Sequence, residues 1–522
     1  MKQFIPAWYD SKNWWKSTVE PFYIKRKVTE FDDMISLISM HQKNSEAFNT
    51  LILNYQPMLR LFLHRHDIYE TSYWSLFDDI QGARQITPHA IDYRDLAWPE
   101  DTEFIYTSFQ VIARTEAHKY SKIQFSQEGY LVVIEEYVHE KLQKKYIFDD
   151  RGFISSIETF QSEDIPNYKK YLNIEGDVVM TQNLITQEIE IDQAFYSYFQ
   201  KKSYAHIDEL IYEKLEYYYT NYLKDTDKVI VAADQNHNHI INKVFSSDNI
   251  CFSVFTQRNR LIDDKMLNTI TMGHYCVVDT LENEKKIKNF IEKNEQFASF
   301  DLMRITPFDV QSLSNISGQL YETNIGVWID GLSEDKLKQL LPQLLQYSLQ
   351  RENVRLHLLT REDFNATSEW LTNEISNINK QLNERNNPLS LEVRDVLETE
   401  IKETEYIQLI FVPFEEDLIK AISRLRIVID MSNEPDLYLQ ISSISAGIPQ
   451  INQRDTEYVD HKLNGLIING IFELNGALDF YILNLKNWNY AFAHSIKLGK
   501  VFSSSKIIQQ LNQLIEGESH GK

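Results

Sequence analysis

Short apolar segments alternate with amphipathic helical stretches twice along the chain, and this alternation limits the folds that are open to it. Strands joined by helices of this length form right-handed βαβ crossovers and a parallel sheet. The sequence therefore predicts an α/β protein with two Rossmann-like doubly wound domains and a cleft between them, at the carboxyl ends of the strands. The segments are KVIVAAD, ICFSVF and HYCVVDT in the first series, then IGVWID, VRLHLLT and RIVIDM in the second.

A different pattern lies between residues 103 and 192. Here apolar and polar residues alternate in segments such as YLVVIEEYVHE, with Gly or charged turns between them. This period is typical of an antiparallel β-meander. The chain is expected to divide into a first lobe of residues 1–102 and 193–320, the inserted β-meander of residues 103–192, a second lobe of residues 321–500 and a C-terminal helix in residues 501–522.

Composition excludes several classes of function. The chain has 522 residues and a net charge of −23, so the whole molecule should repel nucleic acid. Cys251 and Cys276 lie in separate apolar stretches and are expected to be reduced core residues. The N-terminus lacks the apolar region of a signal peptide, and no apolar run is long enough to cross a membrane. A cytoplasmic location is expected.

One part of the second series resembles the nucleotide-sugar pocket of GT-B glycosyltransferases. In that class a Gly-Arg-Leu turn and a following Lys bind the diphosphate, two Glu residues eight positions apart contact the donor, and a Gly-x-Pro turn follows. Lys336, Glu434, Gly447 and Pro449 match this pattern. Arg and Lys neutralise phosphate charge, and a helix N-terminus adds backbone donors for the same anion.

Three positions of the same pattern carry different chemistry. Asp330 and Gly331 stand where the class has Gly and Arg, so a cation is lost and an anion is gained. Ser442 stands where the second Glu belongs, and a hydroxyl cannot replace a carboxylate that binds both ribose hydroxyls. These changes predict a degenerate donor site, no catalytic residue and no cofactor.

The matching residues also have purely structural explanations. Glu434 precedes Pro435 at an expected helix start, where an acid is favoured by the helix dipole. Lys336 fits an ordinary surface lysine in a first helical turn, and AGIP fits a tight helix-to-strand turn. The paired histidines His64/His66 and His237/His239 have no third ligand at metal-binding spacing, so no metal site is expected.

Longer segments resemble a particular family within this class, the first accessory secretory protein of the accessory Sec system. They are FIPAWYDSKNWW at the N-terminus, FDDIQG at residues 77–82, FDDRGFISS at 148–156 and YLNIEGDVVM at 171–180. The resemblance implies a non-catalytic relative of GT-B glycosyltransferases that works with the second and third accessory secretory proteins. It also implies delivery of a glycosylated serine-rich-repeat adhesin to the motor ATPase and channel, and a last helix that crosses back to the first lobe.

Two functions stay open at this point. The replaced Arg and Glu favour a non-catalytic adaptor, whereas the retained Lys336 and Glu434 are compatible with an active retaining glycosyltransferase that O-glycosylates the adhesin. Peripheral contact with an anionic phospholipid membrane requires local basic clusters, because the net charge opposes it. The candidate clusters are Lys25, Arg26 and Lys27, and Lys285, Lys286 and Lys288.

Overall fold

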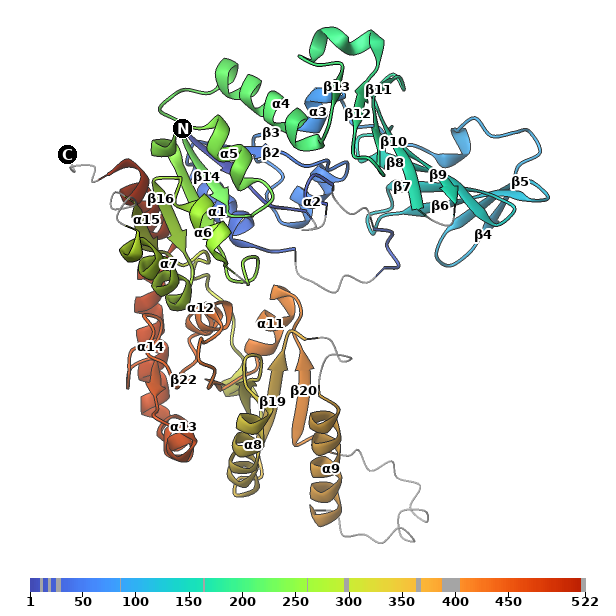
Figure 1. Cartoon of the computed structure of the whole chain (residues 1–522). Helices are drawn as coiled ribbons and strands as arrows, with labels where there is room; N and C mark the ends of the chain where they lie inside the picture. Colours follow the sequence, from blue (N-terminus) through green and yellow to red (C-terminus); the bar gives the residue numbers. More distant parts are fainter. Residues whose placement is uncertain are drawn as a thin grey trace, which may run out of the picture.

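The computed structural model describes residues 1–9, 13–16, 20–24, 30–84, 86–162, 165–260, 262–294, 300–362, 368–386 and 404–517. Two lobes, each built on a parallel sheet, lie one above the other, and an antiparallel sheet projects sideways from the first lobe (Figure 1). The predicted fold class, two Rossmann-like domains with an inserted antiparallel β-meander, is confirmed.

The first lobe contains a seven-stranded parallel sheet in the order β17-β16-β15-β14-β1-β2-β3. Helices cover both faces, so the central strands are continuous apolar runs in which Val229, Ile230 and Val231 are fully buried. Cys251 and Cys276 are buried and free in adjacent strands. The strands are β1 (Lys2–Ile5), β2 (Phe48–Ile52), β3 (Tyr73–Ser75), β14 (Lys228–Ala232), β15 (Ile250–Val254), β16 (Tyr275–Val278) and β17 (Asp301–Arg304). The helices are α1 (Asp33–Lys43), α2 (Leu59–Arg65), α3 (Leu76–Ile80), α4 (Ile207–Tyr222), α5 (Asn238–Val244), α6 (Asp264–Ile270) and α7 (Leu281–Lys293).

The inserted sheet has ten strands that follow one another in space as they do in sequence. Every neighbouring pair is antiparallel, as in Lys122 opposite Glu135. The sheet continues past residue 192, since the two-residue strand β13 pairs with β12 at its edge. The strands are β4 (Glu103–Tyr106), β5 (Val111–Glu116), β6 (Lys119–Phe125), β7 (Leu131–Val138), β8 (Lys141–Asp149), β9 (Phe153–Ser162), β10 (Ile165–Leu172), β11 (Val178–Asn183), β12 (Ile189–Ile191) and β13 (Ser203–Tyr204).

A buried ion network joins this sheet to the first lobe, and we call it the sheet joint. Arg151, in the β8–β9 turn, binds Asp78 of α3 through two bonds of 2.8 and 3.0 Å. It also binds Asp149 at 2.7 Å, and Arg60 of α2 contacts Asp149 at 3.0 Å. The segments FDDIQG and FDDRGFISS thus meet in space and hold the sheet on the lobe.

The second lobe has a six-stranded parallel sheet in the order β20-β19-β18-β21-β22-β23. The central strand β18 has Val327 opposite Leu358 on one side and Ile429 on the other. The strands are β18 (Thr323–Trp328), β19 (Val354–Thr360), β20 (Ile407–Phe411), β21 (Ile427–Asp430), β22 (Gln450–Asn452) and β23 (Gly465–Ile467). The helices are α8 (Glu334–Leu349), α9 (Glu369–Asn386), α11 (Glu415–Ile422), α12 (Leu437–Ala446) and α13 (Leu474–Ile482).

The last two helices connect the lobes along one edge of the molecule (Figure 1). Helix α14 (Leu485–Val501) packs against α12 and α13 of the second lobe, whereas α15 (Ser504–Glu516) packs against α1 of the first. Asn44 donates a hydrogen bond of 2.8 Å to the hydroxyl of Ser504. The apolar side chains of α15 that enter the first-lobe core are Ile507, Ile508, Leu511, Leu514 and Ile515.

Candidate functional site

The turn after β18 is closed by hydrogen bonds within the protein. The Asp330 carboxylate accepts bonds from the Thr360 hydroxyl at 2.5 Å and from the Arg361 backbone amide at 2.9 Å. Gly331 has a φ of +77°, which suits glycine. Asp330 therefore places a carboxylate at the position where the glycosyltransferase pattern has the glycine beside its phosphate-binding Arg.

Lys336 is bonded to the end of the neighbouring strand. It lies in the first turn of α8, where Ser333 caps the helix by accepting from the Lys336 amide. Its ammonium group donates to the Met431 carbonyl at 2.5 Å and to the Gln453 side chain at 2.7 Å. These bonds use two of the three ammonium hydrogens, so a diphosphate would compete with them for this group.

The N-terminus of α12, where an anion would be stabilised, is occupied by a side chain of the protein. Asp436 caps the helix by accepting from the Leu439 amide at 2.8 Å, and it forms an ion pair with Arg361. Asp430 lies close by, because its carboxylate accepts from the Asp436 amide at 2.8 Å. Burial raises the pKa of Asp430 to about 6. The strand ends thus place carboxylates near the position where a phosphate would bind, with Asp430 itself buried.

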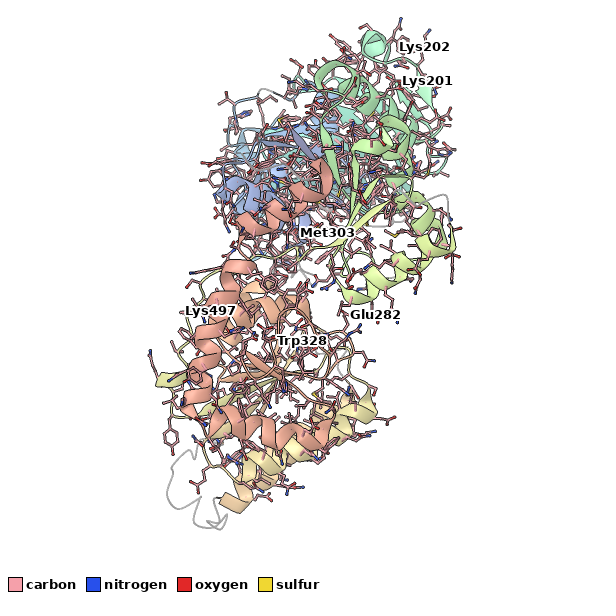
Figure 2. All side chains as sticks on the ribbon, turned by 90° about the vertical axis from the view of Figure 1, so that its left-hand side faces the viewer. Lys201, Lys202, Glu282, Met303, Trp328 and Lys497 are labelled. Atoms are coloured by element: carbon pink, nitrogen blue, oxygen red, sulfur yellow. The ribbon has the colours of Figure 1, made fainter. Side chains whose placement is uncertain are left out.

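Glu434 faces the first lobe. It forms an ion pair of 3.4 Å with Arg454, which also bonds Glu282 of α7 at 3.2 Å. Burial and then the nearby Glu282 raise the pKa of Glu434, while Arg454 acts in the opposite direction. Figure 2 shows Glu282 at the edge of the first lobe nearest the second. The carboxylate that matches a sugar contact in the glycosyltransferase pattern is here part of an ion bridge between lobes.

A second ion bridge crosses the same junction. Arg304, the last residue of β17, bonds Glu284 of α7 at 2.9 Å and forms an ion pair with Glu457 of the second lobe. We call the two arginines and their carboxylates, taken together, the lobe bridges.

Ser442 lies apart from Glu434, with separate neighbours. It is buried on α12 and lines a cavity of about 150 Å³ between the lobes. Ligand pockets are usually of roughly 300 Å³ or more, so this cavity is smaller than a typical ligand pocket. The cavity is lined by Phe31, Ser36, Ser39, Phe308, Asp309, Gln311, Leu313, Ile419, Tyr438, Ile441, Ser442 and Ser445.

The Gly-x-Pro turn has a structural role at this site. Gly447 ends α12 with a φ of +69°, and a Cβ atom there would lie 2.3 Å from the Phe492 ring. The Pro449 carbonyl accepts from the Val428 amide at 3.1 Å, which fixes the start of β22 beside β21. Packing explains the glycine at 447, whereas the bond at Pro449 is a backbone contact that any residue could make.

The remaining candidate residues are scattered. Lys285 and Lys286 are exposed on α7, and Lys288 pairs with Glu284 at 2.7 Å. The cluster of Lys25, Arg26 and Lys27 lies outside the described residues. Within the described ranges, no group of three His, Cys, Asp or Glu residues could hold a metal ion. The same part of the chain contains no helix with the length and apolarity to cross a bilayer.

Sequence reasoning missed both the sheet joint and the lobe bridges. The segments FDDIQG and FDDRGFISS are among those that resemble the family. The two adjacent aspartates in each segment are the sequence feature that could have indicated a buried ion network. No local signal marks the bridge from Arg454 to Glu282, because the partners are 172 positions apart. The glycosyltransferase-like pattern in the second lobe therefore does not predict that Glu434 contacts Arg454.

Two stacked parallel-sheet lobes, with a helix that returns to the first, define a protein of the GT-B class. The chain belongs to the family of the first accessory Sec system protein, accessory secretory protein 1, whose family model matches residues 1–517. The accessory Sec system protein of Staphylococcus aureus (strain NCTC 8325 / PS 47) is 42% identical over 519 residues, which is 99% of each chain.

Solved structures agree with this assignment. The crystal structure of accessory secretory proteins 1, 2 and 3 of Streptococcus pneumoniae contains a similar chain, with 28% identity, a TM-score of 0.77 and 99% of each chain covered. The pneumococcal O-GlcNAc transferase GtfA, solved with UDP and GlcNAc, has 13% identity and a TM-score of 0.66, with 100% of this chain and 99% of that chain covered. The second likeness shows the fold alone.

Proposed function

We propose that this member of the accessory Sec system is a non-catalytic adaptor that uses a glycosyltransferase fold as a scaffold. In this proposal it acts in the cytosol with the second and third accessory secretory proteins. Together they deliver a glycosylated serine-rich-repeat adhesin to the export motor ATPase and channel. Family membership supports the export role, and the solved complex of three accessory proteins from Streptococcus pneumoniae supports the choice of partners.

The non-catalytic part of the proposal rests on one observation. The protein's own side chains occupy the end of the second-lobe sheet where a sugar donor would bind. Lys336 is bonded to Met431 and Gln453, and Asp436 caps the helix where a phosphate would bind. Asp330 adds a further carboxylate at this end of the sheet. A diphosphate would meet negative charge and would have to displace intact contacts, so its binding should be very weak.

Calorimetric titration with UDP-GlcNAc up to millimolar concentration tests this part of the proposal. We expect no binding heat and no shift in melting temperature, with the active transferase GtfA as the positive control. We also expect Glu434→Gln to leave adhesin glycosylation and export unchanged in cells. Micromolar binding of the nucleotide sugar, or loss of sugar transfer on Glu434→Gln in a reconstituted reaction, would establish the alternative of an active retaining glycosyltransferase.

Peripheral contact with the cytoplasmic face of the membrane is a further part of the proposal. Lys285 and Lys286 are exposed, and each basic residue near an anionic surface contributes about 1 kcal/mol. Flotation of the purified chain with acidic liposomes should decrease with salt and with Lys285→Glu/Lys286→Glu. If the chain stays unbound at every salt concentration, its membrane location depends on its partners.

A further inference from the structure

Helix α14 is unlike the rest of the chain in its charge. Residues 480–515 contain four lysines and no Asp or Glu, although the whole protein has a net charge of −23. Three of these lysines, Lys486, Lys497 and Lys500, are exposed on α14. Figure 2 shows this helix uncovered at the surface of the second lobe, with Lys497 labelled. The helix is thus a local basic surface on an acidic molecule.

Three of the large apolar side chains that α14 exposes form one row, while Tyr490 and Val501 are exposed on another side of the helix. Leu485, Phe492 and Ile496 are 60%, 42% and 55% exposed, and their spacing of seven and four residues places them on one side of the helix. Trp488 continues the row inward and stacks on Phe492 with ring centroids 5.9 Å apart. Grouped exposed apolar side chains of this kind mark binding surfaces on soluble proteins.

An arginine without a partner lies beside this row. The guanidinium of Arg426 is 3.8 Å from the centre of the Trp488 ring, and among the described residues it has no hydrogen-bond or ion-pair acceptor. Burial lowers the pKa of Arg426, and no neighbouring acid offsets this effect. A half-buried cation of this kind lacks the carboxylate that would normally accompany it.

We propose that the surface formed by α14 and Arg426 binds an amphipathic helix of a protein partner, with acidic residues beside its apolar stripe. The apolar row would pack against the partner's stripe, while Arg426 and Lys500 would pair with its carboxylates and Lys497, farther round the helix, would add positive charge. Helices commonly recognise each other through an apolar face flanked by complementary charges. The proposal rests on the proposed function in one respect, since it takes the second and third accessory secretory proteins as the partners to test.

The positions of the charges favour a protein over a bilayer. Ala491 and Ser495 are the buried residues of α14, and at 100° per residue Lys486 and Lys500 lie on the opposite, outermost side. The apolar row lies to one side of them, where Phe492 covers Gly447 and the Trp488 indole donates to the Arg426 carbonyl at 2.9 Å. A partner helix that packs on this row would lie beside α14, whereas a flat membrane would meet the outermost lysines first.

Binding of the purified full-length chain to the purified second and third accessory secretory proteins tests the proposal. Ile496→Asp should weaken the complex at least about tenfold, because the new carboxylate interrupts the apolar row and repels the acidic residues of the partner helix. Lys497→Glu/Lys500→Glu should weaken it more at low salt than at high salt. The matched controls are Met272→Asp, at an exposed apolar position of the first lobe, and Lys285→Glu/Lys286→Glu on α7. Circular dichroism checks that each variant stays folded.

The outcomes separate this inference from the proposed function. If the wild type binds its partners and the α14 variants bind equally well, the surface is not the partner site, while the proposed assembly stands. If the wild type binds neither protein, the proposed assembly fails and this inference fails with it. Salt-dependent flotation with acidic liposomes that is lost in Lys497→Glu/Lys500→Glu, with partner binding unchanged, would make the membrane the occupant.

Discussion

The inserted sheet and the second lobe are both attached to the first lobe through arginine–carboxylate pairs, but the two attachments differ in exposure. In the sheet joint, the side chains of Arg151, Asp78 and Asp149 are 5%, 9% and 2% exposed. In the lobe bridges, Arg454 is 31% and Glu282 60% exposed, and Arg304 is 19% and Glu457 33% exposed. Exposed pairs contribute about 0–1 kcal/mol, whereas breaking a buried pair is costly. The sheet is therefore held firmly, and the ion bridges between lobes can open.

Apolar contacts hold the lobes together where the ion bridges do not. Phe308, in the segment between the lobes, stacks on Phe31 with ring centroids 5.6 Å apart and meets Tyr438 of α12 at 5.0 Å. Helix α15 adds apolar side chains of the C-terminus to the first-lobe core. From these contacts we predict four effects on stability, given from the largest to the smallest.

The largest effect should come from removing α15. Deletion from Ser503 onward exposes the first-lobe surface that Ile507, Leu511 and their neighbours cover, and each buried Ile or Leu contributes about 1.5–3 kcal/mol. We expect a clear fall in melting temperature by scanning calorimetry and increased binding of a hydrophobic dye. Removal of residues 518–522 alone is the matched control. Equal melting curves for the two deletions would mean that α15 does not stabilise the first lobe.

Arg151→Met should have the next largest effect. It leaves Asp78 and Asp149 buried without their main partner, and loss of one member of such a network costs about 3–5 kcal/mol. Urea unfolding followed by fluorescence measures the change in the first transition. Arg94→Met is the control, because its pair with Asp92 is exposed. A loss of less than about 1 kcal/mol from Arg151→Met would show that the joint does not depend on these ions.

The stability of the inserted sheet should also depend on pH through Lys169 of β10, which lies outside the sheet joint. Burial lowers the pKa of Lys169 to about 7, although Glu158 at 3.2 Å opposes this shift. Between pH 7 and about 10.5 the unfolded chain holds a proton here that the folded chain has lost, so stability should rise with pH across this range. Lys169→Met should remove this rise in urea unfolding. An equal pH slope in wild type and variant would assign the slope to other groups.

The two attachments also show what sequence could predict. The period of apolar residues predicted both parallel sheets and the meander, because burial on one or two faces leaves a local pattern. The strand β13 was missed because two residues carry no period. Spacing along the chain identified each candidate donor residue. It did not predict that the side chains of Glu434 and Ser442 contact different neighbours. Such partners depend on how the lobes pack, which no local pattern records.

The smallest effect on stability, and the most informative about motion, should come from the lobe bridges. Arg304→Glu/Arg454→Glu places like charges across the junction, opposite Glu457 and Glu282. Stability should change by only about 1 kcal/mol, since these pairs are partly exposed. The distance between spin labels at the exposed positions Lys286 of α7 and Lys338 of α8 should nevertheless lengthen and broaden, and high salt should reduce the change.

The control for this experiment is Arg355→Glu, a charge reversal within the second lobe beside Tyr406. Cys251 and Cys276 are buried, so added surface cysteines can be labelled selectively. If the distances in the bridge variant match those of wild type and of the control, Phe31, Phe308 and α15 fix the angle between the lobes without the ions. A longer distance in the bridge variant alone would instead show that the ion bridges, which include the pair of Arg454 with Glu434, help to set lobe closure.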